Sequence, residues 1–237
     1  MKKLWVVIFI LFGLTRCGEL QQIARQLPST EAITNADIAK ALKEALHQGI
    51  DKEVESLMKA GGFYNQPDVR ILLPDELKKV DEALRKIGLG NLADEGIKKL
   101  NAAAEKAVKE AKPIFVQAIR EMTFEDARKI LMGDQNAATR YLENKTRQSL
   151  YRKFYPIVKQ SFHQVGADDI WNKIISKYNS IPFVKPVNSD LNDYVTRQAL
   201  NGVFKKIADE EIKIRTDFKE RTTELLKKVF ALQDNKN

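Results

Sequence analysis

Residues 190–215 read DLNDYVTRQALNGVFKKIADEEIKIR, and this stretch decides the fold. Its apolar side chains recur at the spacing of one helix face, at Leu200, Phe204, Ile207, Ala208 and Ile212. The stretch contains no proline, and its single glycine costs about 1 kcal/mol relative to alanine inside a helix. We therefore predict one long helix, in which Gly202 lets another helix approach closely.

The same periodicity extends over most of the chain. It predicts helices over 35–60, 74–88, 92–122, 124–132, 135–165, 167–179 and 218–232 in addition to 190–215. Asn35 suits the first helix as its N-cap, Thr123 with Asp126 forms a capping-box pattern, and Pro113 is expected to kink the third helix. Only 63–74 reads as extended. The fold class expected is all-α: a single-domain bundle of seven or eight helices.

The counts of cysteine and histidine exclude several kinds of functional site. The chain has 237 residues, 43% of them hydrophobic and 30% charged, with one cysteine and two histidines. One cysteine excludes an internal disulfide and a multi-cysteine zinc site. Glu44 and His47 match half of a Glu-x-x-His di-iron motif, but no second copy accompanies them. We expect no metal site, no cofactor and no catalytic residue that spacing alone can identify.

The N-terminus resembles a lipoprotein signal. Lys2 and Lys3 precede an apolar run, Leu4–Leu14, that is too short for a transmembrane helix. The run ends in LTRC at Cys17, which resembles the bacterial lipobox, although Arg16 stands where a small residue is usual. The resemblance implies lipidation of Cys17, and Gly18 after it implies the outer membrane. An uncleaved hydrophobic stub is the alternative.

The expected layout follows from that reading: a signal peptide over 1–16, a tether with a short helix over 17–34, a helical domain over 35–232 and a polar tail over 233–237. Removal of 1–16 would lower the net charge from +8 to +5. Behind a signal peptide, an anionic membrane or cell-wall polymer suits a basic surface better than nucleic acid does.

Several polar residues fall within the apolar stripes. Glu211 lies on the buried face of the 190–215 helix, and Arg215 follows it at the i+4 spacing of an ion pair. Buried charges must be paired, so we expect such groups to meet across helices. The candidate buried polar network comprises Asn101, Glu105, Asp126, Arg140, Arg147, Glu211 and Arg215. It is either a ligand or catalytic pocket, or a hydrogen-bond network that fixes helix register.

The basic residues are concentrated in 138–178, which holds eight bases and three acids. Lys145, Arg152 and Lys159 recur every seven residues and form one basic stripe. Seven aromatic residues are interleaved with these bases, as in surfaces that stack bases or anchor at membrane interfaces. The alternative is a solvated lysine face over an aromatic core.

Three blocks of residues carry a family resemblance. They are Asp126-Ala127 with Ile130-Leu131, Gly133 and Ala137–Tyr141; Tyr194-Val195 with Ala199-Leu200, Gly202 and Phe204; and Glu211 with Ile214-Arg215, Arg221-Thr222 and Val229-Phe230. From about residue 35 onward the chain resembles the bacterial domain-of-unknown-function family 4197. It departs from that pattern at Leu72, Ala102 and Phe218. The resemblance implies helical proteins carried behind a lipoprotein signal; it implies no reaction.

The function expected is that of a lipid-anchored cell-envelope protein on the periplasmic side of the outer membrane. We expect a non-enzymatic interaction or scaffold module. Its partners would be the membrane, through the N-terminal lipid, and other envelope proteins or anionic lipid. One alternative is a helical carrier for an apolar or anionic small ligand, and another is an unrecognised hydrolase.

Overall fold

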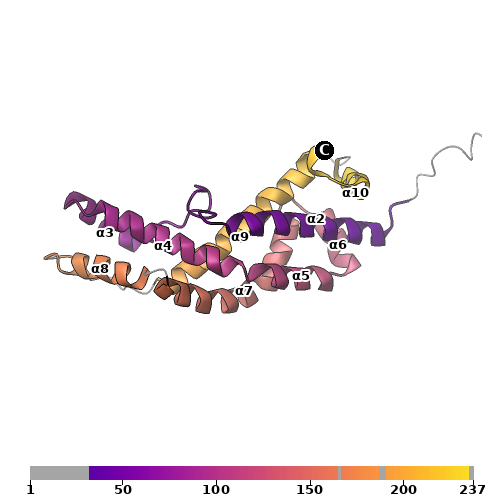
Figure 1. Ribbon diagram of the computed structural model, residues 1–237. Coiled ribbons are helices and arrows are strands. Elements are labelled where there is room, and N and C mark those ends of the chain that lie inside the picture. Colours follow the sequence, from indigo (N-terminus) through magenta and orange to yellow (C-terminus); the bar gives the residue numbers. More distant parts are fainter. Residues whose placement is uncertain (1–31, 165–166, 187–190, 235–237) are drawn as a thin grey trace, which may run out of the picture. The chain divides into compact units, whose positions relative to one another are not determined.

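A computed structural model describes residues 32–164, 167–186 and 191–234. The chain divides into residues 1–33 and one compact unit, Thr34–Asn237. The described part of that unit contains helices and no strand (Figure 1). The helices are α2 (Asn35–Leu57), α3 (Asp75–Lys86), α4 (Gly90–Val108), α5 (Ala111–Glu121), α6 (Phe124–Leu131), α7 (Ala137–Gln164), α8 (Ala167–Asn179), α9 (Asn192–Thr216) and α10 (Glu224–Asp234), with a short 3₁₀ turn, η1 (Phe218–Glu220). The all-α prediction is therefore confirmed.

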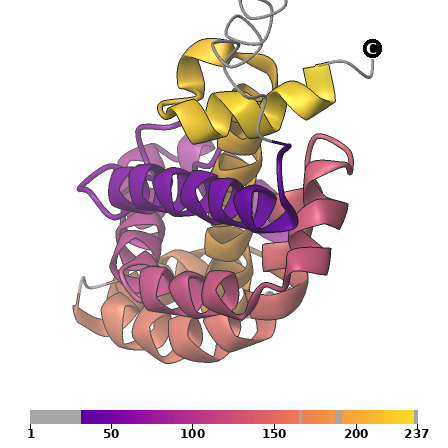
Figure 2. The ribbon, with the colours of Figure 1, turned by 90° about the vertical axis from the view of Figure 1, so that its right-hand side faces the viewer.

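Helix α9 is the centre of the packing. It contacts α7, α2 and α4, and Figures 1 and 2 show it running between α2 on one side and α7 on the other. Its buried side chains include Val203, Phe204 and Ile207, and the ring of Phe204 meets that of Phe115 edge to face at 5.8 Å. The apolar stripe of 190–215 is thus the seam on which the other helices pack.

Helix boundaries differ from the prediction where backbone polar groups find other partners. The N-cap of α2 is Thr34 and not Asn35, because the Thr34 hydroxyl accepts from the Asp37 N–H in a capping box. Segment 92–122 comprises two helices that break at Lys109–Glu110. Pro113 lies in the first turn of α5, where its missing N–H leaves no hydrogen bond unmade. The predicted kink is therefore a break between helices.

One local prediction agrees with the structure in full. Thr123 and Asp126 form the capping box that starts α6. Pro156 lies inside α7, which continues to Gln164. In contrast, 63–65 and 67–69 form turns on the way from α2 to α3, and 70–74 have no regular secondary structure. Phe63 of this segment packs against α9 at Gly202, where a Cβ would lie 2.8 Å from the Phe63 ring. Gly202 therefore admits a turn segment and not another helix.

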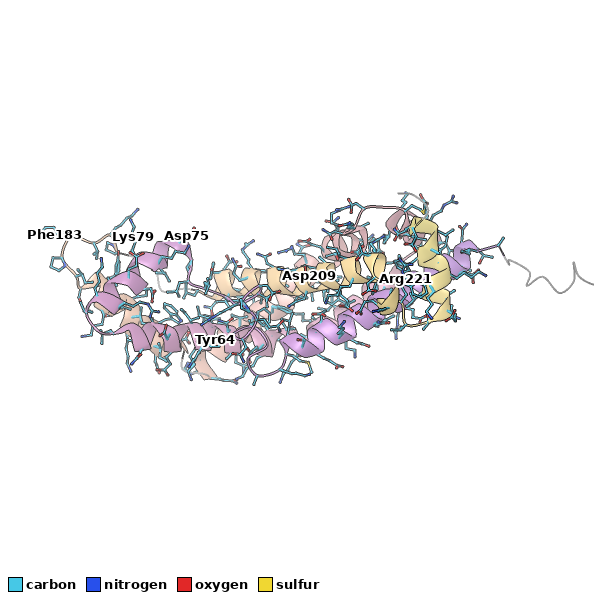
Figure 3. The ribbon with its side chains drawn as sticks, turned by 90° about the horizontal axis from the view of Figure 1, so that it is seen from above. Tyr64, Asp75, Lys79, Phe183, Asp209 and Arg221 are labelled. Atoms are coloured by element: carbon cyan, nitrogen blue, oxygen red, sulfur yellow. The ribbon has the colours of Figure 1, made fainter. Side chains whose placement is uncertain are left out.

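Helices α3, α4 and α8 form one end of the unit. Gly96 of α4 admits Trp171 of α8, whose ring would lie 3.1 Å from an added Cβ. Figure 3 shows Phe183 and Lys79 at this end, whereas Arg221 lies toward the other end, where α9 gives way to α10. The buried charged residues Glu211, Arg215 and Arg221 lie toward the α10 end, whereas Trp171 packs at the other end.

Candidate functional site

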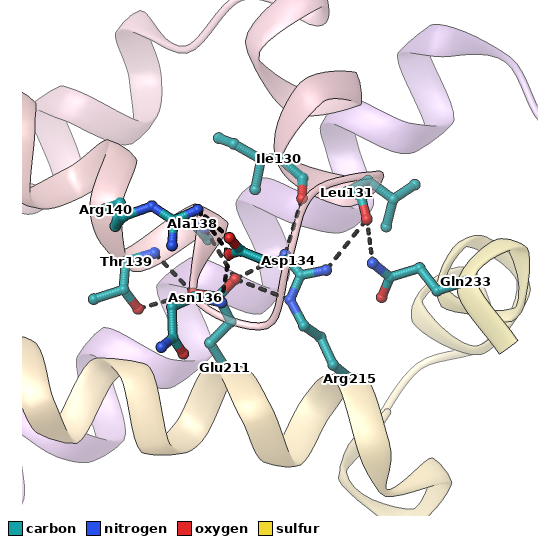
Figure 4. Close-up of polar contacts among 10 residues, drawn as sticks. All are labelled: Ile130, Leu131, Asp134, Asn136, Ala138, Thr139, Arg140, Glu211, Arg215 and Gln233. Carbon is teal, nitrogen blue, oxygen red and sulfur yellow. Dashed lines mark hydrogen bonds and ion pairs between the residues drawn. The ribbon is translucent and has the colours of Figure 1, made fainter. Parts of the chain in front are cut away.

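The most buried charged cluster lies where α6 ends and α7 begins. α9 carries Glu211 and Arg215 into this junction, because both lie on its buried face one turn apart. Their side chains are 7% and 5% exposed, and Arg215 Nη2 lies 2.7 Å from Glu211 Oε1 (Figure 4). We call Glu211, Arg215 and their partners the α9 clamp.

Glu211 caps α7 from a distance. Its Oε1 accepts a hydrogen bond from the Ala138 N–H at 2.9 Å, and its Oε2 accepts from the Thr139 N–H and hydroxyl, each at 2.8 Å. The first N–H groups of a helix lack partners within the helix and favour negative charge. A carboxylate on α9 therefore satisfies the start of α7, although Thr139 lies 72 residues before Glu211 in the chain.

Arg215 caps the C-terminal end of α6, the helix before α7. It donates to the Ile130 carbonyl at 3.0 Å and to the Leu131 carbonyl at 3.2 Å, at the C-terminal end of α6. Gln233 of α10 also donates to the Leu131 carbonyl (Figure 4). The ion pair thus joins the end of α6 to the start of α7 and fixes both on α9.

Arg221 extends the clamp toward α10. It is 2% exposed and donates to the Ile214 and Arg215 carbonyls, in the last turn of α9, at 3.1 and 2.8 Å. Both of its terminal nitrogens also reach the Asp234 carboxylate, at 2.6 and 2.8 Å. Sequence reasoning missed this residue because 218–232 was read as one helix. The absence of an apolar stripe before Glu224 is the signal that could have located the break.

Two further buried carboxylates, Glu53 and Glu210, lie on α2 and α9. Glu210 is 1% exposed and pairs with Lys52 at 2.7 Å and with Lys213 at 3.3 Å. Glu53 is also buried. Burial raises the pKa of Glu53, and the charge of Glu210 raises it further, while Lys206, Lys213 and Lys52 oppose the shift. Periodicity points to neither glutamate, since each adjoins charged residues in the chain.

Asn101 and Glu105 do not join the α9 clamp. The fully buried Asn101 amide exchanges two hydrogen bonds of 2.9 Å with the backbone of Ile71 and donates to the Ile97 carbonyl. The half-buried Glu105 accepts from the Phe63 N–H at 3.3 Å, and burial raises the pKa of its carboxyl group. Both residues fasten segment 63–74 onto α4.

The other three predicted members of the network lie nearer to solvent. Asp126 is used in the capping box of α6. Arg140 is 55% exposed and pairs with Asp134, not with Glu211. Arg147 pairs with Glu143 and donates to Asn201 at 2.9 Å, with its guanidinium 5.2 Å from the centre of the Phe204 ring. Periodicity places these arginines toward α9, but at positions where neighbouring helices leave the guanidinium exposed.

The basic stripe lies apart from the clamp. Lys145, Arg152 and Lys159 are all exposed on α7. Cys17 and the rest of the predicted signal peptide and tether up to residue 31 lie outside the described residues. Within the described part, no group of three His, Cys, Asp or Glu side chains could hold a metal ion, and no helix is long and apolar enough to span a bilayer.

A small cavity adjoins the clamp between α2, α7, α9 and α10. Its volume is about 20 Å³, and Gly49, Phe230, Glu210, Glu211 and Arg215 are among its lining residues. A cavity of this size holds about one water molecule. The geometry defines an all-α protein whose buried ion pair serves as a joint between helix ends.

A comparison with protein families identifies the family of the helical unit. A model of the family described as "Protein of unknown function (DUF4197)" matches residues 32–231. The chain therefore belongs to this family, as its residues predicted. The chain matches no curated protein and no solved structure.

Proposed function

We propose that this chain is a lipid-anchored cell-envelope protein whose helical unit acts as a non-enzymatic interaction or scaffold module. The sequence supports the anchor: a short basic start, the apolar run Leu4–Leu14 and LTRC ending at Cys17. Gly18 after the lipidated cysteine supports the outer membrane, on its periplasmic side. Acyl chains at Cys17 would hold the unit near the bilayer, since stable attachment takes more than one chain.

The observation that carries the non-enzymatic interpretation is the way Glu211 and Arg215 are used. Both Glu211 oxygens accept hydrogen bonds from the start of α7, and Arg215 is shared between Glu211 and the end of α6. A general acid or base needs a free position within hydrogen-bond reach of a substrate. Here those positions are filled by the backbone, which supports a structural role for the cluster.

The cavity beside the α9 clamp argues against a carrier that binds its ligand at this position. Its volume of about 20 Å³ suits a single water molecule, whereas ligand pockets usually measure about 300–1,000 Å³. A ligand could enter there only if α2 separated from α9, and the larger hollow of about 450 Å³ beside Tyr64, Lys98 and Glu105 is an open surface depression. Native mass spectrometry of the detergent-extracted protein tests this: a stoichiometric small-molecule adduct would overturn the scaffold proposal in favour of a carrier.

Metabolic labelling with palmitate tests the anchor. Wild-type protein is expected to incorporate label, and Cys17→Ser is expected to abolish it and leave an uncut precursor. Arg16→Ala is the matched control, because it places a small residue before the cysteine and is expected to label at least as well as wild type. Equal labelling of wild type and Cys17→Ser would exclude lipidation at Cys17.

A further inference from the structure

Helix α7 contains a long segment without negative charge. From Asn144 to Ala167 the sequence has no Asp or Glu, while it has Lys145, Arg147, Arg152, Lys153 and Lys159. Elsewhere in the described part many lysines and arginines lie beside carboxylates, as in the pairs of Lys112 with Asp51 and of Lys129 with Glu125. This segment therefore presents a local excess of positive charge.

Most of these cations are free of carboxylate partners. Lys145, Arg152, Lys153 and Lys159 are exposed, and within the described residues none forms an ion pair. Arg152 only donates to the Ser149 hydroxyl at 3.3 Å, and the Lys145 amine lies 5.7 Å from the centre of the Tyr141 ring. The charges of Arg152, Lys153 and Lys159 are available to an external anion, whereas Lys145 also acts on Asp126, whose pKa its charge helps to lower.

The free cations share one outward line on the helix. Lys145, Arg152 and Lys159 are spaced by seven residues, which places successive charges about 10 Å apart along the axis. The buried side of α7, with Leu150, Phe154 and Val158, faces the other way. Figures 1 and 2 both show α7 along the lower edge of the unit, with the other helices above it. We call this outward line the basic face of α7.

We propose that the basic face of α7 lies on the phosphate headgroups of an anionic membrane surface. A straight row of cations on a convex helix suits an extended flat surface that carries negative charge. This inference rests on the proposed lipid anchor for its geometry. Sixteen residues separate Cys17 from Thr34, and an extended chain of that length reaches about 55 Å.

The short range of screened electrostatic attraction explains why the lipid anchor and the basic face of α7 would act together. At physiological ionic strength the Debye length is about 8 Å, so the cations attract the membrane only when α7 lies next to it. A lipid at Cys17 would keep the unit within reach of the surface, and the basic face would then decide which side of the unit meets it. The opposite side, with α2, would face away and remain open to other envelope proteins.

Vesicle sedimentation of the chain 18–237, without any acyl group, tests the basic face separately from the anchor. The helical unit Thr34–Asn237 has its own core and its own capped first helix, so it should fold in this form. Wild-type protein is expected to bind vesicles of phosphatidylglycerol and phosphatidylcholine far better than vesicles of phosphatidylcholine alone. Binding should weaken as salt is raised.

The decisive comparison is between two triple variants of equal charge. Lys145→Gln, Arg152→Gln and Lys159→Gln together should lower the partition coefficient on the order of 100-fold, which is about fivefold for each cation removed. The control changes Lys40, Lys79 and Lys228 to Gln, which are exposed on α2, α3 and α10. It should leave binding within a fewfold of wild type.

Three results would overturn the proposal. These are equal binding to neutral and anionic vesicles, equal losses in the two triple variants, and binding to DNA or an anionic glycan with no binding to vesicles. Absence of palmitate label from the wild-type protein, together with intact vesicle binding by the chain 18–237, would instead refute the anchor alone, so the two proposals fail separately.

Discussion

Glu211 shows how one carboxylate can be accommodated in the interior of a helical protein. Its oxygens accept hydrogen bonds from two backbone N–H groups and the Thr139 hydroxyl at the start of α7. They also accept from the Arg215 guanidinium, so both oxygens have hydrogen-bond partners. Taking two ions out of water costs several kcal/mol for each, which good geometry only repays in part. The pair therefore contributes more to the specific placement of α6 and α7 than to overall stability.

Removing one member of the pair should lower the free energy of unfolding by more than the intact pair contributes to it. Glu211→Ala leaves Arg215 buried without its anion and leaves the Ala138 and Thr139 N–H groups without their acceptor, at an expected cost of about 3–5 kcal/mol. Glu211→Gln keeps the volume and one acceptor oxygen and should cost less. Urea unfolding at pH 7 measures both free energies.

An exposed ion pair supplies the control for Glu211. Glu224 pairs with Lys227 and is 90% exposed, so Glu224→Ala should change the free energy of unfolding by at most about 1 kcal/mol. If Glu211→Ala changes stability no more than Glu224→Ala does, the α9 clamp does not hold the helix ends in the way described.

Glu53 leads to a prediction about pH. Burial is the larger cause that raises its pKa above the usual 4.5, and the neighbouring Glu210 adds to the shift. Because the folded chain then holds this proton more tightly than the unfolded chain does, ionisation of Glu53 above that pH destabilises the fold. Glu53→Gln should therefore be more stable than wild type at pH 7, and the difference should vanish as the pH falls below 4.5.

Urea unfolding of wild type and Glu53→Gln across this pH range measures that difference. Glu82 is exposed and serves as the matched position, where Glu82→Gln should show no comparable pH-dependent gain. A Glu53→Gln variant that is less stable than wild type at pH 7 would contradict the raised pKa.

At the scale of elements, contacts at helix ends and close approaches at glycines set how the helices meet around the apolar seam of α9. α7 takes its cap from α9, α6 gives its last carbonyls to Arg215, and α9 ends on Arg221. Gly202 of α9 admits the Phe63 ring, and Gly49 of α2 lies against Glu210. Each contact fixes the position along the helix axis at which the next element packs.

The two glycines should respond to alanine with opposite signs. At Gly202 a Cβ would lie 2.8 Å from Phe63 Cε1, so Gly202→Ala should destabilise by about 1–3 kcal/mol despite its better helix propensity. At Gly49 the nearest atom, Glu210 Cγ, is 3.4 Å away, so Gly49→Ala should stabilise by up to about 1 kcal/mol. Thermal or urea unfolding distinguishes the two, and a stabilising Gly202→Ala would show that Phe63 does not pack there.

At the scale of the whole molecule, residues 34–237 form one compact unit, although its two ends are held differently. The α10 end is joined by the buried charges of the α9 clamp. The α3–α8 end is joined by apolar contacts, such as Trp171 with Gly96, and by the Asn101 amide, which fixes the approach to α3. Helix α4 runs from this end toward the middle, where it packs on α7 and α9.

One tryptophan can report whether the two ends unfold together. The sequence has Trp5 and Trp171, so the chain 18–237 retains only Trp171, which is buried in α8. Its fluorescence reports on the α3–α8 end, while far-UV circular dichroism reports on all helices. The two urea transitions are expected to coincide. A Trp171 transition at lower urea would show that this end unfolds as a separate unit.

The sequence by itself determined the secondary structure, because helix formation depends on a local period. The stripe through Leu200, Phe204 and Ile207 marked α9 and its buried face, and Thr123 with Asp126 marked the start of α6. The same period placed Glu211 among buried residues, with Arg215 one turn away. The family resemblance came from the same residues and held for 32–231.

Only the tertiary structure decided what those residues contact. A helical period gives the angle of a side chain around its axis but not which segment covers that angle. Arg140 has the angle of a buried residue but lies at an uncovered first turn, so it pairs with Asp134 in solvent. The partners of Glu211 are unpaired backbone groups at a helix start, and such groups meet a distant carboxylate only once the helices are packed.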